Sequence, residues 1–307
     1  MRPEQLLSDD RITFGFVTSA RSEPARLEAM GADSLWTGGH IASRNPSPEA
    51  MMGLAGLVEQ TSEVTVGTSI LLLPLYPPAL VAKQIADLDC ASRGRIALGV
   101  GIGGEYPQEF RATGVPIGER GARLDEAIPL LRKLWTAEEI SHDGRFYPME
   151  DVKIHPAPQQ GSGLPILVAG RKEAAMRRAA RMGDGWMPYM YSPRRYRSSV
   201  ESVRAYAAEA ARDLTRFSWS QFTAFNVQPD GDAARREAAA FLGGTYDQGF
   251  EEMITHVAAV GTPAEVTARL TEYVEAGVRH FIFMAATLGA MADQARVLLE
   301  DVIPQMG

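Results

Sequence analysis

The stretch VTVGTSILLLPLYPPALVAKQIADLDCASRGRIALGVGIGG at residues 64–104 decides the fold. Two apolar runs within it, 64–68 and 95–100, are rich in β-type residues and are separated by one helix-type segment. This order is typical of a βαβ unit, whose parallel strands are buried on both faces. The first run leads into Thr68-Ser69-Ile70, and the second leads into the glycine cluster Gly101-Ile102-Gly103-Gly104. Parallel α/β folds bind ligands at the carboxyl ends of their strands, so both segments are candidate site residues.

Strand-type and helix-type segments alternate along nearly the whole chain, which gives about eight β/α units. Strands are expected at 12–17, 34–37, 64–68, 95–100, 165–168, 185–187, 217–227 and 280–284. Helices are expected at 23–30, 48–60, 79–91, 118–135, 173–182, 193–212, 262–276 and 289–303. We therefore predict a (β/α)8 TIM barrel formed by a single domain over 1–307. An open doubly wound sheet is the alternative.

Two segments interrupt the alternation. Residues 140–155 predict a hairpin of two short extended pieces, with a tight turn at His142-Asp143-Gly144-Arg145. Residues 233–260 are interpreted as inserted helical material. Directly after them, Thr262 and Glu265 have the spacing of a capping box, which marks the start of the next helix.

Composition and charge exclude several classes of function. The chain has 307 residues, a net charge of −7 and one cysteine, Cys90, so an intrachain disulfide and a cysteine-based metal cluster are excluded. An acidic chain without a basic run is a poor candidate for binding nucleic acid or anionic membranes. No secretory signal is visible at the amino terminus, and the longest apolar run, 70–75, contains Pro74 and is too short to span a bilayer. We expect a cytoplasmic protein.

The glycines from Gly99 to Gly104 formally match the dinucleotide-binding pattern G-x-G-x-x-G. That pattern requires its last glycine to open a helix whose N-terminus holds a pyrophosphate. Here Glu105 would place negative charge at that position, and Thr113-Gly114-Val115-Pro116 soon ends any helix. We interpret the cluster as a strand end that allows a flat ligand to approach the backbone closely.

Several segments, in this order and spacing, resemble the bacterial luciferase-like superfamily of flavin- and F420-dependent oxidoreductases, the luciferase-like monooxygenases. They are GADSLWTGGH at 31–40, VGTSILLLPLYPPALVAKQIADLDCASRGRIALGVGIGG at 66–104, EFRATGVPIGERGARLDEAIPLLRKLW at 109–135, HDGRFYPMEDVKIHPAPQQ at 142–160, ILVAGRKEAAMRRAARMGDGWMP at 166–188 and GTPAEVTARL at 261–270. The resemblance implies a luciferase-like (β/α)8 barrel with insertions, which agrees with the alternation. It also implies a small-molecule substrate and a homodimer.

The resemblance implies a catalytic role for His40. Related enzymes often place a histidine just after the second strand, near the cofactor ring. A histidine there can donate or accept a proton, because its pKa lies near working pH. Many relatives have an acidic residue immediately before this histidine, but this chain has Gly39. A carboxylate that would orient the imidazole is therefore missing or comes from elsewhere in the chain.

Two segments are expected to hold the cofactor. Ser69-Ile70 matches the place where the family carries a non-prolyl cis peptide behind the flavin ring, and Thr68, Gly101 and Gly103 lie beside it. Ala169-Gly170-Arg171-Lys172 follows a strand and opens a helix, so free N–H groups, the helix dipole and two cations favour an anion. In the family this region holds the cofactor phosphate. We expect the substrate pocket to include Trp36, Tyr106, Trp186, Met187 and Met190.

These features predict an oxidoreductase that depends on a flavin-type cofactor. With FMN, the enzyme would monooxygenate a small organic substrate and would receive reduced flavin from a separate reductase. With coenzyme F420, it would transfer a hydride as a reductase or dehydrogenase. The residues leave the choice of cofactor open. An alternative of another class is a non-catalytic flavin-binding protein. No H-E-x-x-H motif indicates a metal, and no G-x-S-x-G motif indicates a hydrolase.

Overall fold

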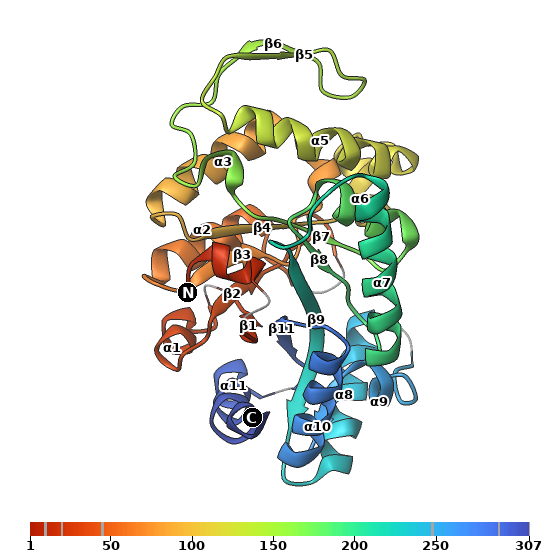
Figure 1. Cartoon of the computed structure of the whole chain (residues 1–307). Helices are drawn as coiled ribbons and strands as arrows, with labels where there is room; N and C mark the ends of the chain where they lie inside the picture. Colours follow the sequence, from red (N-terminus) through yellow and green to blue (C-terminus); the bar gives the residue numbers. More distant parts are fainter. Residues whose placement is uncertain (9–10, 20, 44–45, 247–248, 288, 307) are drawn as a thin grey trace.

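Eight parallel strands form a closed barrel in a computed structural model that describes residues 1–8, 11–19, 21–43, 46–246, 249–287 and 289–306 (Figure 1). In order around the barrel they are β1 (Thr13–Val17), β2 (Ser34–Thr37), β3 (Thr65–Thr68), β4 (Ile96–Val100), β7 (Ile166–Ala169), β8 (Gly185–Met187), β9 (Ser218–Val227) and β11 (His280–Ala285). The ring closes because β11 pairs with both β9 and β1. The barrel prediction is confirmed, and the open doubly wound sheet is wrong.

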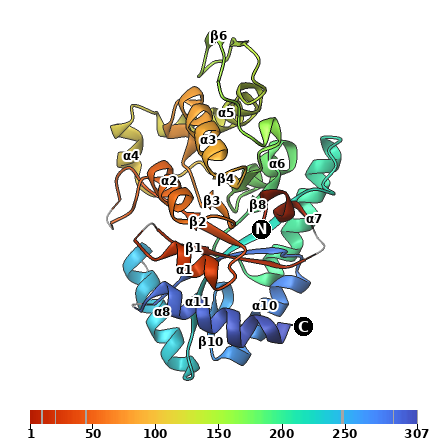
Figure 2. The same cartoon turned by 90° about the vertical axis from the view of Figure 1, so that its left-hand side faces the viewer.

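Helices lie between successive strands and cover the outside of the barrel (Figures 1 and 2). They are α1 (Pro24–Ala29), α2 (Ala50–Gln60), α3 (Pro78–Ala91), α4 (Pro107–Ala112), α5 (Arg120–Leu134), α6 (Glu173–Met182), α7 (Pro193–Glu209), α8 (Gly231–Tyr246), α9 (Ile254–Val257), α10 (Pro263–Glu275) and α11 (Met291–Val297). Short helical turns occur at Pro3–Leu7, Leu73–Leu75, Ile117–Glu119, Gly161–Gly163, Leu298–Val302 and Ile303–Met306. The capping box is present, because Thr262 and Glu265 hydrogen-bond each other's backbone N–H groups. Among the described residues, no helix is long and apolar enough to cross a membrane.

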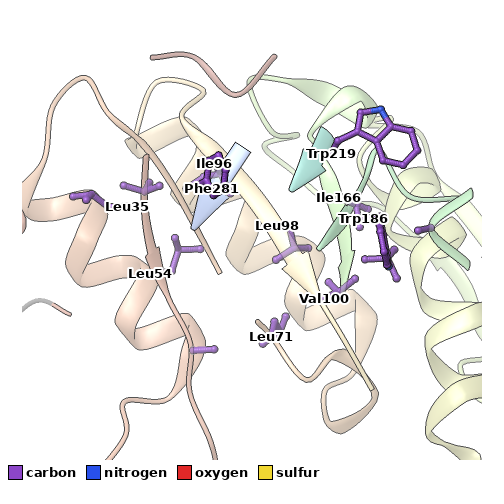
Figure 3. Close-up of a cluster of buried hydrophobic side chains, with 14 of the residues drawn as sticks. Leu35, Leu54, Leu71, Ile96, Leu98, Val100, Ile166, Trp186, Trp219 and Phe281 are labelled. Atoms are coloured by element: carbon purple, nitrogen blue, oxygen red, sulfur yellow. The ribbon is translucent and has the colours of Figure 1, made fainter. Parts of the chain in front are cut away.

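Alternate side chains of each strand face opposite layers, as a strand requires. One set points outward and packs under the helices, where Leu35, Leu98 and Phe281 lie with Leu54 of α2 in one fully buried cluster (Figure 3). The other set fills the barrel interior with Trp36, Ala97, Leu167, Met187 and Ile282. Burial of both faces explains why the middle of most strands is apolar.

A closed polar network occupies the amino-terminal end of the barrel. His280, Thr13 and Ser34 are the first residues of β11, β1 and β2. His280 Nδ1 lies 2.7 Å from Thr13 Oγ1, and its Nε2 lies 3.4 Å from Ser34 Oγ, which accepts a bond from Trp36 Nε1. Burial without a charged partner lowers the pKa of His280 to about 3, so its ring is neutral.

The predicted helical insertion at 233–260 requires a correction at its end. Its first part forms α8 and α9, but Ala259–Gly261 is a strand, β10. β10 pairs in parallel with the last residues of the long strand β9, beyond the part of β9 that pairs with β8. The strand was missed because three apolar residues carry too little periodicity to distinguish a strand from a helix end.

The predicted hairpin is present, but its tight turn at 142–145 is wrong. β5 (Ile140–His142) and β6 (Met149–Val152) pair in antiparallel register, and residues 143–148 connect them. The carboxylate of Glu126 on α5 accepts hydrogen bonds from the backbone N–H groups of Phe146 and Tyr147. These bonds hold the connection against α5 and widen the turn, a tertiary contact that local sequence does not show.

Candidate active site

His40 and Glu109 form a contact at the carboxyl end of the barrel. His40 lies three residues after β2, and its Nδ1 is 3.2 Å from each carboxylate oxygen of Glu109 on α4. The His40 side chain is 28% exposed, whereas that of Glu109 is 0% exposed. A buried carboxylate beside an imidazole fixes the ring and stabilises the positive charge that a second ring proton brings.

The backbone holds the Glu109 carboxylate in place before any ligand binds. Oε1 of Glu109 accepts hydrogen bonds from the N–H groups of Ile41 at 2.7 Å and Ala42 at 3.4 Å. The loop that carries His40 thereby supplies the bonds that orient its partner. Among the described residues, no hydrogen bond reaches Nε2 of His40, so this nitrogen is left for a ligand.

Helix α4 explains how the carboxylate reaches His40. Pro107 occupies the first position of this short helix, where its missing N–H costs no hydrogen bond, and Tyr106 precedes it. The Tyr106 ring meets the His40 ring edge-on with 4.8 Å between centroids. Figure 2 shows α4 on the same side of the molecule as the start of α2. The carboxylate missing at Gly39 therefore comes from elsewhere, across 69 residues of sequence.

A second tyrosine, Tyr76, lies near the His40–Glu109 pair. Tyr76 donates a hydrogen bond of 2.6 Å to Oε1 of Glu49, the residue that caps α2. Burial, the bond to Glu49 and the charges of Glu49 and Glu109 raise the pKa of Tyr76 far above its usual value. Tyr76 therefore stays protonated as a donor and holds the Glu49 carboxylate.

The predicted bulge after β3 is present, with a cis peptide bond between Ser69 and Ile70. Gly101 lies next to it at the end of β4, and a Cβ on Gly101 would lie 2.2 Å from Cδ1 of Ile70. Thr68 is buried and donates to the carbonyl of Gly99, while Gly103 lies half-buried in the loop that follows. The missing Cβ at Gly101 leaves room for the Ile70 side chain at the barrel mouth.

The predicted anion site lies where β7 leads into α6. Gly170 has a φ of +135°, and a Cβ there would lie 2.6 Å from that of Ala175, so this turn requires glycine. Lys172 is the exposed N-cap of α6, and Arg171 is half-buried. Neither cation forms an ion pair with another described residue. Both charges therefore remain available to a ligand anion at this helix N-terminus.

Tyr189 connects this anion site to the glycine-rich loop after β4. The guanidinium of Arg171 lies 4.5 Å from the centre of the Tyr189 ring. The Tyr189 hydroxyl donates a bond of 3.1 Å to Oε1 of Glu105. Burial and the nearby Glu105 carboxylate raise the pKa of Tyr189, so the hydroxyl remains a donor. The sequence places both residues in segments expected to border the pocket, 102–116 and 185–192, but does not predict their contact, which joins loops 84 residues apart.

The five residues expected in the substrate pocket lie in different layers. Tyr106 and Met190 are half-buried after β4 and β8. Met187 and Trp36 are buried inside the barrel, where Trp36 packs against His280. Trp186 faces the helices instead, contacts Tyr191 and Tyr196, and donates to the Gly170 carbonyl. We therefore propose only Tyr106 and Met190 as residues that touch a substrate.

The residues at the barrel mouth fit a flavin-type cofactor on two structural observations. Ser69 Oγ is buried and has no hydrogen-bond partner among the described residues, which suits a polar atom of a bound ring. The unpaired cations Arg171 and Lys172 suit a phosphate. Among the described residues, no group of three or more His, Cys, Asp or Glu side chains is placed so that it could hold a metal ion.

Comparison with known proteins agrees with this arrangement of strands. The family model described as luciferase-like monooxygenase matches residues 17–280. The chain belongs to this family. Proteins of this family are oxidoreductases, and relatives of the chain use F420 or FMN. The predicted resemblance is confirmed over most of the sequence.

Two relatives show how the similarity is distributed. An uncharacterized protein of Mycobacterium tuberculosis is 42% identical over 142 residues, which are 46% of this chain and 48% of that protein. The chain thus matches about half the length of that relative. The F420-dependent glucose-6-phosphate dehydrogenase of Amycolatopsis mediterranei is 27% identical over an alignment that covers 92% of each chain.

A solved structure supports the fold. An F420-dependent secondary alcohol dehydrogenase in complex with an F420-acetone adduct superimposes with a TM-score of 0.85. The superposition covers 97% of this chain and 99% of the other, at 20% identity. The superposition establishes the shared luciferase-like barrel. An identity of 20% says nothing about the substrate of this chain.

Proposed function

We propose that the protein is an F420-dependent oxidoreductase that transfers a hydride between the cofactor and an alcohol or carbonyl compound. The observation that carries this proposal is the His40–Glu109 contact, because interconversion of alcohol and carbonyl requires one proton to move at the substrate oxygen. The F420-dependent glucose-6-phosphate dehydrogenase relative supports the choice of cofactor, since its alignment covers 92% of this chain.

The chain's own residues would act as follows. Glu109 accepts a hydrogen bond from Nδ1–H of His40, which leaves Nε2 of the neutral ring as an acceptor. Nε2 takes the proton from the substrate hydroxyl in oxidation and returns it in reduction. The Glu109 carboxylate stabilises the resulting imidazolium without taking the proton itself. Bound F420 supplies or accepts the hydride.

Binding of the cofactor would use the other residues of the mouth. Arg171 and Lys172 hold the phosphate, together with the N–H groups at the start of α6. Ser69 Oγ and the backbone beside Gly101 contact the ring. The Tyr189 ring restrains the Arg171 guanidinium, so less side-chain freedom is lost when the phosphate binds.

A monooxygenase that uses reduced FMN is the second candidate function. It is favoured by the description of the matching family model, luciferase-like monooxygenase. The same cations would hold the FMN phosphate, and His40 would act on a different substrate. In this case a separate reductase would supply the reduced flavin.

Anaerobic equilibrium titration of the purified protein tests the proposal. Fluorescence is followed while oxidised or reduced F420, or oxidised or reduced FMN, is added to separate samples. We expect micromolar binding of F420 and at least tenfold weaker binding of FMN in either redox state. Selective binding of reduced FMN would overturn the proposal in favour of the monooxygenase. Binding of neither cofactor would contradict both functions.

A further inference from the structure

Apolar side chains line the floor of the barrel mouth. Val17 and Ala169 are the last residues of β1 and β7, Ile70 follows β3, and Phe222 lies within β9. All four are half-buried and pack on the interior cluster. They form the floor of the mouth. Helices cover only the outer faces of these strands, so the partial exposure of inward-facing side chains opens toward the mouth.

Apolar side chains continue upward from this floor along β8, β9 and β11. Met284 of β11 pairs in register with Ala224 of β9, two residues beyond the pair of Ile282 and Phe222. Met190, Met284, Phe241 and Met253 are half-buried and pack against one cluster that also contains Ala224. We call Phe222, Met190 and Met284 the apolar wall.

The backbone at Met190 points to a ligand site as well. Met190 has a φ of +50°, a backbone conformation that is uncommon for residues other than glycine, asparagine or aspartate. Residues in such conformations cluster where ligands bind. Methionine side chains are flexible and polarisable, so a wall with two of them adapts to apolar ligands of different shape.

The carboxylate of Glu237 on α8 borders this side of the mouth, where it accepts hydrogen bonds from Asn226, Gln228 and Thr287, but the strand ends themselves carry no charge. The segments 187–192, 222–229 and 284–291 contain no lysine, arginine, aspartate or glutamate. Along the chain, Arg194 and Arg195 closely follow the first segment, and Arg235 on α8, which follows the second, is engaged by Asp232 at 2.8 Å and Glu265 at 3.0 Å. The segments themselves supply no counterion to a substrate phosphate, and burying an unpaired charge in an apolar setting is costly.

We propose that the apolar wall binds an uncharged alcohol or ketone with an aliphatic body, and that it does not bind a sugar phosphate. The alcohol or ketone function rests on the proposed function above, whereas the apolar body rests on the wall alone. The substrate oxygen lies at His40, and the aliphatic part extends over Phe222 toward Met190 and Met284. The charge of the mouth is then reserved for the cofactor phosphate.

A homologous series of ketones tests this proposal by binding rather than by turnover. 2-Alkanones from 2-butanone to 2-octanone are titrated calorimetrically into the protein, both alone and loaded with oxidised F420. Oxidised cofactor and ketone have no hydride to exchange, so only binding is measured. Each added methylene should strengthen binding about fourfold, the value for burial of one CH₂ group. Glucose 6-phosphate should show no saturable binding.

Three variants locate the effect. Met190→Gln and Met284→Gln should each weaken 2-octanone binding at least fivefold and should change F420 binding less than twofold. Met52→Gln, at an exposed position on α2, serves as the matched control and should change neither. Unchanged F420 binding also shows that a variant is folded.

The outcomes separate this proposal from the proposed function. A flat dependence on ketone length, or saturable binding of glucose 6-phosphate, overturns the apolar wall even if F420 binds. A fourfold step for each methylene together with loss at both methionine variants supports it. If the steps are present but F420 does not bind, the proposed function fails and the apolar wall stands.

Discussion

The two ends of the barrel both contain a histidine, but they treat it differently. At the amino-terminal end, His280 is fully buried, neutral and bonded through both ring nitrogens to hydroxyl groups. At the carboxyl end, His40 is partly exposed and bonded through one nitrogen to a carboxylate. A completed polar network serves stability, whereas a network that stops at an accessible atom is prepared for a ligand.

This comparison predicts its largest effect at His40. His40→Ala should lower the turnover of 2-octanol with F420 by about 10²–10⁴-fold, the usual contribution of a positioned acid or base. F420 affinity should change less than threefold, because the ring acts on the proton and not on the phosphate. Steady-state kinetics together with an F420 titration measures both. His256→Ala, at an exposed histidine on α9, is the control; a fall of less than fivefold for His40→Ala would remove His40 from the mechanism.

The next largest effect is expected for Arg171, one of the two cations at the barrel mouth. Arg171→Ala should weaken F420 binding about 10- to 100-fold, since a hydrogen bond between charged groups contributes roughly 1.5–3 kcal/mol. Binding of 2-octanone should remain unchanged, which separates the cofactor side from the apolar wall. Fluorescence and calorimetric titrations measure the two affinities. Arg181→Ala, in the last turn of α6, the helix that follows Arg171, is the matched control. Equal F420 affinity for both variants would place the phosphate elsewhere.

At the amino-terminal end of the barrel, the buried neutral His280 should make the protein less stable in acid. Its pKa is lowered from 6.5 to about 3 in the folded state, so between these values the unfolded chain binds a proton that the native protein does not. Stability therefore falls as the pH drops below 6.5, by about 1.4 kcal/mol per pH unit from this group. Urea unfolding at a series of pH values measures the free energy of unfolding. As the pH falls below 6.5, this free energy should decrease more steeply in the wild type than in His280→Gln, by about the slope given above. Parallel curves for the two proteins would contradict a buried neutral imidazole.

The smallest effect is expected for Tyr189, which follows β8 at the carboxyl end of the barrel. Tyr189→Phe removes the hydrogen bond to the exposed Glu105 but keeps the ring beside Arg171. The free energy of unfolding should fall by about 0.5–1.5 kcal/mol and F420 affinity by less than threefold. Tyr206→Phe on α7, whose ring also lies against an arginine, is the comparison variant. A tenfold loss of affinity would show that the hydroxyl itself touches the cofactor.

Local sequence patterns were enough to predict the barrel and the end of it that carries the candidate site. Alternating strand-type and helix-type segments are local signals, and a buried parallel strand needs apolar residues on both faces, as in 95–100. The cations after β7 and the glycines after β4 were visible for the same reason, because each follows a strand directly. The capping box at Thr262 depends on residues three positions apart and was equally readable.

Which side chains meet at the site depends on how the strands are arranged in the barrel. Glu109 reaches His40 because β2 and β4 flank β3 in the barrel and bring their following loops to one side. The same holds for Glu105 with Tyr189, for β10 with β9, and for the apolar wall, whose members come from three strands. No local pattern encodes these contacts, since the barrel's closure sets them and many sequences share that closure. The sequence therefore placed the site at the carboxyl ends of the strands, while packing supplied its carboxylate and its apolar side.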